Sequence, residues 1–321
     1  MRIDVHNHAV PRRAVELLRA DAAYGVEVDG DTIRGPGHVP FPLLPSFVDP
    51  AAKLAELEAR SLDAAVVSVA PPLFHYDVDA GAADRLCRAV NAGLADFCQF
   101  RPDRLRWMAH VPMQAPERAA AVLGDARDAG CVGVEVGTSI AGRRLDEPAL
   151  EPFWEAAERM RLPVLLHPAY GAPNPALQPY YLVNVIGYLL ETTIAVERLI
   201  CAGVLDRHPG VRVVLAHAGG YFPFQGGRLR HARTVRPELA GAPEDPFAYA
   251  GRVLVDTITH DPRALGYVVD RMGAENVVMG TDLPFDMATP DPLGELAAAV
   301  DGEIATRIAE TNPARLYDFP G

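Results

Sequence analysis

The sequence begins Met1-Arg2-Ile3-Asp4-Val5-His6-Asn7-His8, an apolar run that ends on two histidines. Residues two apart on a β-strand point to the same face, so this stretch aims two imidazoles at one point. Three later apolar runs also end on residues that bind metal ions, namely His167, His217 and Asp282. Such strand ends converge only if the strands belong to one parallel sheet or barrel. Three or four nitrogen and oxygen ligands describe a catalytic divalent metal site, most often zinc.

Eight short apolar segments, many of them β-branched, predict strands: Ile3–His8, Ala64–Ala70, Leu105–Val111, Val132–Gly137, Pro163–His167, Val211–His217, Arg252–Ile258 and Val277–Asp282. Continuous apolar strands are typical of parallel sheets that are buried on both faces. Helical patterns lie between them, at Ala51–Ser61, Asp84–Phe100, Pro116–Ala129, Ala149–Arg161 and Pro262–Met272. This alternation predicts a (β/α)8 TIM barrel of the α/β class, in one domain over residues 1–321. A doubly wound open sheet is the alternative, but ligands on the first, fifth, sixth and eighth strands favour closure.

Two segments depart from the alternation. Residues 24–50 are rich in glycine and proline and contain aromatic and apolar residues. We expect this insertion after the first strand to form a small lid, with a hairpin, over the carboxyl end of the barrel. Ala169–Tyr181 is a similar loop after the fifth strand, and it leads into a predicted long helix over Val183–Leu205.

Composition excludes several classes of protein. The chain of 321 residues has 30 basic and 42 acidic residues and a net charge of −12, which argues against a nucleic-acid partner. No run of about 18 apolar residues predicts a membrane span. The first strand begins at once, so we expect no signal peptide. The four cysteines lack CxxC spacing and are expected to be reduced and buried, which favours a cytoplasmic protein.

The residues alone leave the roles within the metal site open. Active sites of such barrels lie at the carboxyl ends of the strands, where these candidates fall. A metal ion there lowers the pKa of a bound water and polarises a substrate oxygen. Asp282 is a ligand, a proton shuttle or both. Either His167 or His217 is a base instead of a ligand.

The chain resembles the aminocarboxymuconate-semialdehyde decarboxylase-like branch of the amidohydrolase superfamily. The resemblance rests on the segments Ile3–His8, Leu166–Pro168, Leu215–Gly220, Gly280–Phe285 and Asn312–Leu316. It implies a (β/α)8 barrel with one divalent metal ion, zinc or alternatively manganese. It also implies that His6, His8, His167 and Asp282 are the ligands and that His217 is the acid/base. Lys53, the only lysine, is expected away from any strand end, which argues against a carbamylated lysine and a binuclear centre.

The resemblance implies a non-oxidative decarboxylase of an aromatic or unsaturated, muconate-like carboxylic acid. In that reaction the metal stabilises charge next to the leaving carboxylate, and a nearby acid protonates the carbon that loses CO2. The alternative is a hydrolase or hydratase that uses the same metal-bound water on a lactone, an amide or an enoate. The sequence does not separate the two, because the fold and the metal site serve both.

Substrate binding is predicted for three residues. The resemblance implies that Arg228 binds the substrate carboxylate from a neighbouring subunit of a homodimer, and arginine suits this role through its bidentate fork. The alternative for Arg228 is a solvated helix residue in an ion pair with an acidic neighbour. Phe222 and Phe285 stand beside ligand strand ends and are candidate pocket walls. A second arginine expected in the lid has no match, and the apolar stretch Val39–Leu44 fits an aromatic or larger substrate better.

Overall fold

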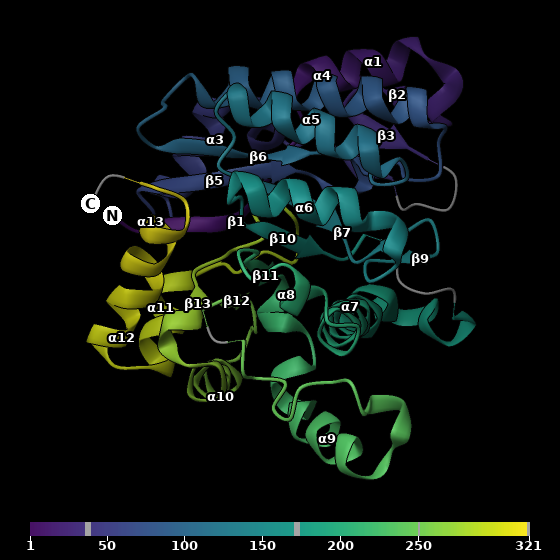
Figure 1. Ribbon diagram of the computed structural model, residues 1–321. Coiled ribbons are helices and arrows are strands. Elements are labelled where there is room, and N and C mark those ends of the chain that lie inside the picture. Colours follow the sequence, from purple (N-terminus) through teal and green to yellow (C-terminus); the bar gives the residue numbers. More distant parts are fainter. Residues whose placement is uncertain (36–39, 170–173, 250, 320–321) are drawn as a thin grey trace.

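The computed structural model describes residues 1–35, 40–169, 174–249 and 251–319. Its centre is a parallel eight-stranded sheet in chain order: β1 (Ile3–Ala9), β5 (Ala64–Val69), β6 (Leu105–His110), β7 (Gly133–Gly137), β10 (Val164–His167), β11 (Val213–Leu215), β12 (Val253–Asp256) and β13 (Val277–Val278). The backbone N–H groups of Val5 and His8 donate to the carbonyls of Met279 and Leu283 at 2.9 and 2.8 Å. These bonds join the first strand to the last segment. The predicted (β/α)8 barrel is confirmed (Figure 1).

Helices surround the barrel, and some of them begin at aspartates suited to helix starts. The helices include α1 (Arg12–Ala20), α3 (Pro50–Glu58), α4 (Ala80–Cys98), α5 (Pro116–Asp128), α6 (Glu151–Met160), α7 (Leu189–Cys201), α8 (Val204–Arg207), α9 (Phe222–Val235), α10 (Pro262–Met272), α11 (Pro292–Ala299), α12 (Gly302–Thr306) and α13 (Asn312–Leu316). The side chains of Asp49, Asp79 and Asp261 accept backbone N–H groups at the starts of α3, α4 and α10. Each bond satisfies a donor that the first helical turn leaves unpaired.

The apolar core has an inner and an outer part. Inside the barrel, alternate strand residues such as Val66, Met108 and Leu165 form one buried cluster, which Tyr317 and Phe319 join from the C-terminal segment. Between the strands and the helices lies a larger cluster, to which each strand contributes the residues of its other face. Strands buried on both faces are apolar throughout. A polar side chain that points into the barrel is therefore an exception to this apolar pattern.

The insertion after the first strand contains a small antiparallel sheet of β2 (Glu27–Asp29), β3 (Thr32–Arg34) and β4 (Phe41–Pro42), followed by the short helix α2 (Pro45–Val48). The pairing of β2 with β3 confirms the expected hairpin. Residues 36–39, which belong to the predicted lid, lie outside the described residues. The ring of Phe41 packs against Phe47, with centroids 4.9 Å apart, so the insertion has its own apolar anchor.

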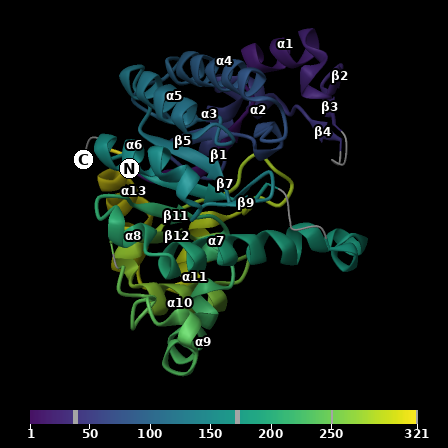
Figure 2. The same cartoon turned by 45° about the vertical axis from the view of Figure 1, so that its right-hand side comes forward.

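The predicted helix over Val183–Leu205 is divided into three pieces, a correction to the sequence prediction. A π-helix covers Val183–Tyr188, α7 follows it, and α8 begins after Gly203. Gly203 has a φ of +69°, a conformation that interrupts an α-helix. In the preceding loop, residues 170–173 lie outside the described residues, while Pro175–Leu177 and Pro179–Tyr181 form short 3-10 turns. Figure 2 shows α7 and the segment before it extending away from the barrel.

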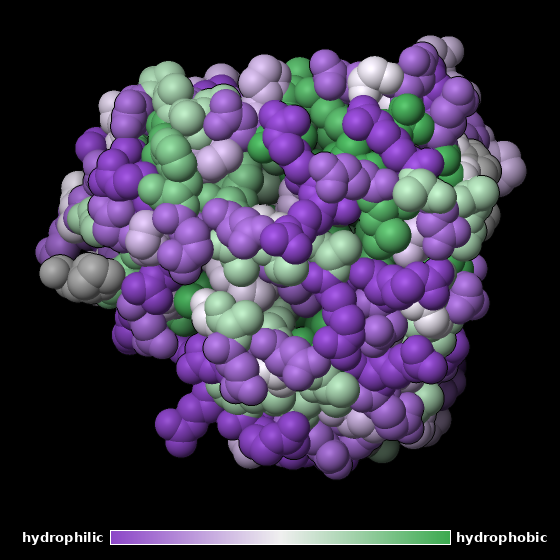
Figure 3. All heavy atoms as spheres, turned by 90° about the horizontal axis from the view of Figure 1, so that it is seen from above, coloured by the Kyte–Doolittle hydropathy of each residue, from purple (hydrophilic) through white to green (hydrophobic). Residues whose placement is uncertain are grey.

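Hydrophilic residues cover much of the face drawn in Figure 3, with apolar residues interspersed among them. Within the described part of the chain, no helix is both long and apolar enough to cross a membrane. All four cysteines are free, and three are buried as predicted, but Cys201 is only half-buried because it lies at the end of α7 on the outer layer.

Candidate metal centre

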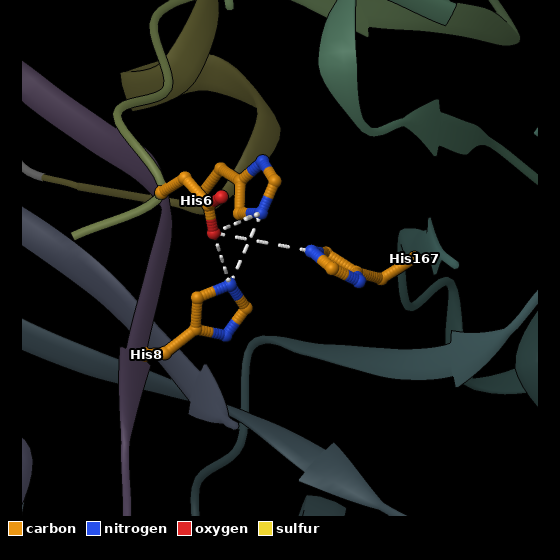
Figure 4. A group of neighbouring side chains, drawn as sticks. His6, His8 and His167 are labelled. Carbon is orange, nitrogen blue, oxygen red and sulfur yellow. Dashed lines mark hydrogen bonds and ion pairs between the residues drawn. The ribbon is translucent and has the colours of Figure 1, made fainter. Parts of the chain in front are cut away.

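Four of the predicted site residues converge at the carboxyl end of the barrel. His6 and His8 lie on β1, His167 ends β10, and Asp282 follows β13 by four residues. Their ligand atoms all lie within 4.8 Å of one another, and each residue is buried. Figure 4 shows the imidazoles of His6 and His8, both on β1, and of His167, at the end of β10, pointing toward one another. The structure thus brings together residues that are 276 positions apart in the chain, from His6 to Asp282.

The strand that carries His6 and His8 pairs irregularly with its neighbour. The pairing of β1 with β5 is irregular between Asp4 and Asn7, the pattern of a β-bulge. Bulges occur often beside active sites, where they redirect side chains. Val5 lies in the inner core cluster, and His6 and His8 both face the cluster of ligand atoms beyond it.

The spacing of the ligand atoms would allow all four residues to bind one metal ion. Nε2 of His8 lies 3.1 Å from Nε2 of His6 and 3.1 Å from Oδ1 of Asp282. Nε2 of His167 lies 4.0 Å from the same carboxylate oxygen. Two metal–ligand bonds of about 2.1 Å that meet at a tetrahedral angle hold their outer atoms about 3.4 Å apart. The observed distances lie on both sides of that value.

Each of the three histidines uses its other ring nitrogen to contact an oxygen atom. Nδ1 of His6 lies 2.7 Å from Oδ2 of Asp256, that of His8 lies 3.2 Å from the carbonyl of Val69, and that of His167 lies 2.8 Å from the carbonyl of Pro168. An Nδ1–H that donates to oxygen leaves the lone pair on Nε2, which is the arrangement of metal-binding histidines. Nε2 of His167, moreover, is buried and has no hydrogen-bond partner among the described residues. The donor set therefore fits a divalent metal ion.

The charges of the residues around the ligand cluster favour the binding of a cation there. Burial opposes ionisation of Asp282, but hydrogen bonds with His217, His6 and His8 hold its pKa well below the usual value. Burial also opposes protonation of His6, yet Asp256 and Asp282 outweigh it and raise the pKa of His6 to about 10. Burial lowers the pKa of His8 to about 4 and lowers that of His167 well below its usual value. Two carboxylates and two neutral imidazoles thus surround a place that attracts a cation.

His217 lies beside this cluster, with Nε2 3.6 Å from Oδ2 of Asp282. The sequence placed His217 and Asp282 on their strands, and the structure corrects both positions. β11 ends at Leu215 and β13 at Val278. The two residues have φ angles of +54° and +67°, which no strand residue adopts. Such strained backbone is common at functional sites, where the surrounding structure holds it.

Two buried carboxylates near the cluster were missed by the sequence analysis. Asp256 ends β12 and accepts a hydrogen bond from His6. Glu135 on β7 lies 3.8 Å from Nδ1 of His8, and burial raises its pKa well above the usual value. Neither oxygen of Glu135 has a hydrogen-bond partner among the described residues. Both acids stand in apolar strand segments, the same signal that identified His167.

Lys53 corrects another expectation. This lysine of α3 was placed away from any strand end, but its side chain is fully buried and Nζ donates to the carbonyl of His8 at 2.9 Å. Burial lowers its pKa to about 8. Helix α3 packs near the carboxyl end of β1, a contact that sequence distance does not reveal. Lys53 binds the main chain and is not among the clustered ligand atoms.

The three predicted substrate-binding residues lie in different places. Phe285 is beside the cluster, with its ring centroid 5.2 Å from that of His8. Phe222 is buried and packs against Phe247 at 5.0 Å. Arg228 is exposed on α9, and no hydrogen bond or ion pair joins it to the described residues, so the alternative of an intrachain ion pair is not observed. Helix α9 lies at the edge of the molecule in Figure 1.

The barrel and the ligand cluster at its carboxyl end define a metal-binding (β/α)8 protein. Residues 3–319 match the amidohydrolase family, and the chain belongs to this family. A 2-amino-3-carboxymuconate-6-semialdehyde decarboxylase of Dictyostelium discoideum is 30% identical and is matched over 97% of this chain and 86% of its own length. A gamma-resorcylate decarboxylase of Rhodococcus jostii is 27% identical over 83% of this chain and 86% of its own.

The solved structures agree with the sequence relatives. The crystal structure of Metarhizium anisopliae IDCase in apo form has a TM-score of 0.88 to this chain and 26% identity, and the match covers 99% of this chain and 97% of that one. The predicted membership of the decarboxylase-like branch is therefore confirmed by relatives that are matched over 97% and 83% of this chain.

Proposed function

We propose that this protein is a metal-dependent, non-oxidative decarboxylase of an aromatic or unsaturated carboxylic acid. The observation that carries the proposal is the cluster of His6, His8, His167 and Asp282 with His217 beside it. The decarboxylase relatives in two substrate classes, an aminocarboxymuconate semialdehyde and a resorcylate, support the reaction type.

One divalent ion, held by the four clustered residues, is part of the proposal. We expect zinc, because three imidazoles and one carboxylate are ligands that zinc favours, and manganese is the alternative. When bound, the ion supplies positive charge that polarises a substrate oxygen and stabilises the charge that develops as CO2 leaves. Asp256 and the carbonyls of Val69 and Pro168 keep the ligand imidazoles oriented.

His217 is the proposed acid. In decarboxylation the bond between the carboxyl carbon and the substrate carbon breaks, and its electron pair stays on the substrate carbon. That carbon then takes a proton, so the products are CO2 and the protonated carbon skeleton, and no oxidant is needed. Nε2 of His217 lies beside the ligand cluster, where it can deliver this proton, and the carboxylate of Asp282 lies 3.6 Å away, close enough to orient the imidazole.

An aromatic wall supports an aromatic substrate. The ring of Phe285 lies 5.2 Å from that of His8, 5.7 Å from that of Phe41 and 5.2 Å from that of Phe47. Phe41 belongs to β4 of the insertion, so the proposed lid contacts the wall of the site. Edge-to-face contacts with such rings favour a flat aromatic ligand. Arg34 of the same insertion is exposed on β3.

The homodimer is proposed from exposed apolar residues near the site. Tyr180 is 90% exposed and Tyr181 49%, and Val185, Ile186 and Leu190 are exposed on the same segment. This segment extends from the barrel in Figure 2. Apolar residues gathered on such a projection mark an interaction site. A second copy that covers it is the proposed partner, and Arg228 of that copy is the proposed ligand for the substrate carboxylate.

The proposed location is the cytoplasm, where cysteines stay reduced. The four cysteines are free, and the buried Cys87 and Cys131 have pKa values that burial raises above the usual one. Such thiols are inert packing residues.

The test is CO2 release by the metal-loaded protein from hydroxybenzoates, aminobenzoates and muconates. We expect release from at least one aromatic acid, with the decarboxylated ring or diene as the second product in equal amount. The His6→Ala variant is the matched control and should release none. Consumption of a lactone, amide or enoate without CO2 would instead assign a hydrolase or hydratase. No turnover of any acid by protein with a full metal content would contradict the proposal.

A further inference from the structure

Asp256 is the residue on which four hydrogen bonds converge. It is fully buried at the end of β12. Its Oδ2 accepts from Nδ1 of His6 at 2.7 Å and from the backbone N–H of His217 at 2.9 Å. Its Oδ1 accepts from the backbone N–H groups of Ala218 at 2.7 Å and Ile258 at 3.0 Å. We propose that Asp256 is a positioning residue that couples the metal ligand His6 to the acid His217, an inference that rests on the proposed function for the role of His217.

The first effect of Asp256 is on the metal ligand. An imidazole that donates Nδ1–H to a carboxylate is fixed in one tautomer and one orientation, and its Nε2 becomes a stronger ligand. His6 faces Asp256 with Nδ1, while its Nε2 lies 3.4 Å from Oδ1 of Asp282. Asp256 therefore keeps the lone pair of His6 directed at the cluster.

The second effect is on the turn that carries the acid. His217 and the next residue, Ala218, have φ angles of +54° and +53°. Two consecutive non-glycine residues in this region are strained and persist only where other contacts hold them. The N–H groups of both residues donate to the Asp256 carboxylate, one to each oxygen. Asp256 therefore holds the turn that places the His217 side chain beside Asp282.

The two effects are coupled because Oδ2 serves both. The same oxygen accepts the ring N–H of His6 and the main-chain N–H of His217. An asparagine at this position has one accepting oxygen for four donors, and its amide nitrogen would face two N–H groups. One substitution should therefore disturb the metal ligand and the acid together.

The test compares Asp256→Asn with Asp4→Asn. Asp4 is a matched control because it is also a fully buried carboxylate with three hydrogen bonds, from the backbone N–H of His6 and the side chains of Asn7 and Thr281. It accepts from no imidazole nitrogen and does not touch the His217 turn. Metal affinity is measured by competition with a chromophoric chelator, and the ligand field by the visible absorption spectrum of the Co²⁺-loaded protein.

We expect Asp256→Asn to bind Zn²⁺ about 10- to 100-fold more weakly and to change the Co²⁺ spectrum, while Asp4→Asn weakens binding by less than about 10-fold. At saturating metal, Asp256→Asn should still have a lower kcat and a shifted pH profile, because the His217 turn is released. Equal metal affinity and an unchanged Co²⁺ spectrum in Asp256→Asn would overturn the proposal. These two readouts need no substrate, so they remain decisive if the decarboxylase proposal fails.

A second measurement covers the case in which Asp256→Asn does not fold. In the Zn²⁺-loaded wild-type protein labelled with ¹⁵N-histidine, NMR distinguishes the two neutral tautomers. We expect the His6 ring to carry its proton on Nδ1, in a strong hydrogen bond that shifts the proton signal downfield. A His6 ring that carries its proton on Nε2 in the metal-loaded protein would exclude the proposed role of Asp256.

Discussion

The carboxylate of Asp282 faces two ways, with Oδ2 3.6 Å from Nε2 of His217 and Oδ1 3.1 Å from Nε2 of His8. Oδ1 is therefore among the clustered ligand atoms, and Oδ2 lies beside His217, the proposed acid. His217 itself is outside the group of four residues whose ligand atoms lie within 4.8 Å. This geometry separates metal binding from proton transfer.

The first prediction follows from that separation. His217→Ala should keep most of its metal but lose about 10²-fold or more in turnover, the size typical of removing a general acid or base. Metal content by mass spectrometry and CO2 release from the active substrate check both parts. His231→Ala, which removes an exposed histidine of α9, is the control and should change neither. A metal-free His217→Ala protein would show that His217 is a ligand.

The second prediction concerns the metal itself. Purified protein should contain about one divalent ion per chain, and His6→Ala or His8→Ala should lose it, since each removes a metal–ligand bond. Metal that binds only the folded chain also stabilises it, by about 4 kcal/mol when the free metal is 1,000 times its Kd. A chelator should therefore lower the Tm of the wild type and leave that of His6→Ala nearly unchanged. Unchanged metal content in both variants would refute the ligand assignment.

The third prediction tests the bond between Lys53 and the carbonyl of His8. Lys53→Met keeps a long side chain in the buried site but removes the donor. We expect a loss of about 1–3 kcal/mol in the free energy of unfolding, the cost of leaving a buried polar group unpaired. Urea unfolding at constant metal concentration measures it. Arg13→Met, which breaks the exposed ion pair with Asp96, should cost less. Equal stability of Lys53→Met and wild type would mean that the bond contributes nothing.

The fourth prediction concerns the aromatic wall beside His8. Phe285→Ala removes the ring that contacts both His8 and the insertion residue Phe41. For an aromatic substrate we expect KM to rise roughly 3- to 10-fold, which is the loss of binding that the removal of one aromatic contact causes. The change in kcat should be smaller. Phe100→Ala, at an exposed phenylalanine after α4, is the control. If KM for the aromatic acid stays at the wild-type value, Phe285 does not line the substrate site.

The barrel and the ligand cluster were predictable because their signals are local. Eight apolar segments alternate with helical patterns, and His6 and His8 have the spacing of one strand face. His167 ends such a segment directly, and it is the last residue of β10. These features depend on residues that are close together in the sequence, so the sequence alone is enough to predict them.

The remaining features depend on tertiary structure. The positive φ angles of His217 and Asp282 come from turns that follow the strands, and an apolar run does not mark where a strand ends. Asp256 and Glu135 lie in apolar runs like His167 does, but these runs do not show which groups a buried carboxylate contacts, and only the closed barrel brings the two acids to the cluster. Lys53 reaches His8 across 45 residues through the packing of α3.

The fifth prediction tests Arg228 and the homodimer together. Arg228 is exposed on α9 and is joined to none of the described residues by a hydrogen bond or ion pair, so it is free to reach a neighbouring copy. A chain with a net charge of −12 repels a carboxylate substrate, so a second cation beside the metal ion favours its binding. Arg228→Ala and His217→Ala homodimers should each be nearly inactive. Sedimentation of the wild type should show a dimer.

Mixing the two variants distinguishes action between subunits from action within one. In a mixed dimer, the Arg228→Ala chain keeps its own His217 and receives Arg228 from its partner, so one of the two sites is complete. Random exchange makes half of the dimers mixed, and activity should return to about a quarter of the wild-type value. If Arg228 serves its own chain, neither site is complete and mixing restores nothing. Subunit exchange verified by mass, without recovered activity, would therefore exclude the role of Arg228 in the partner's site.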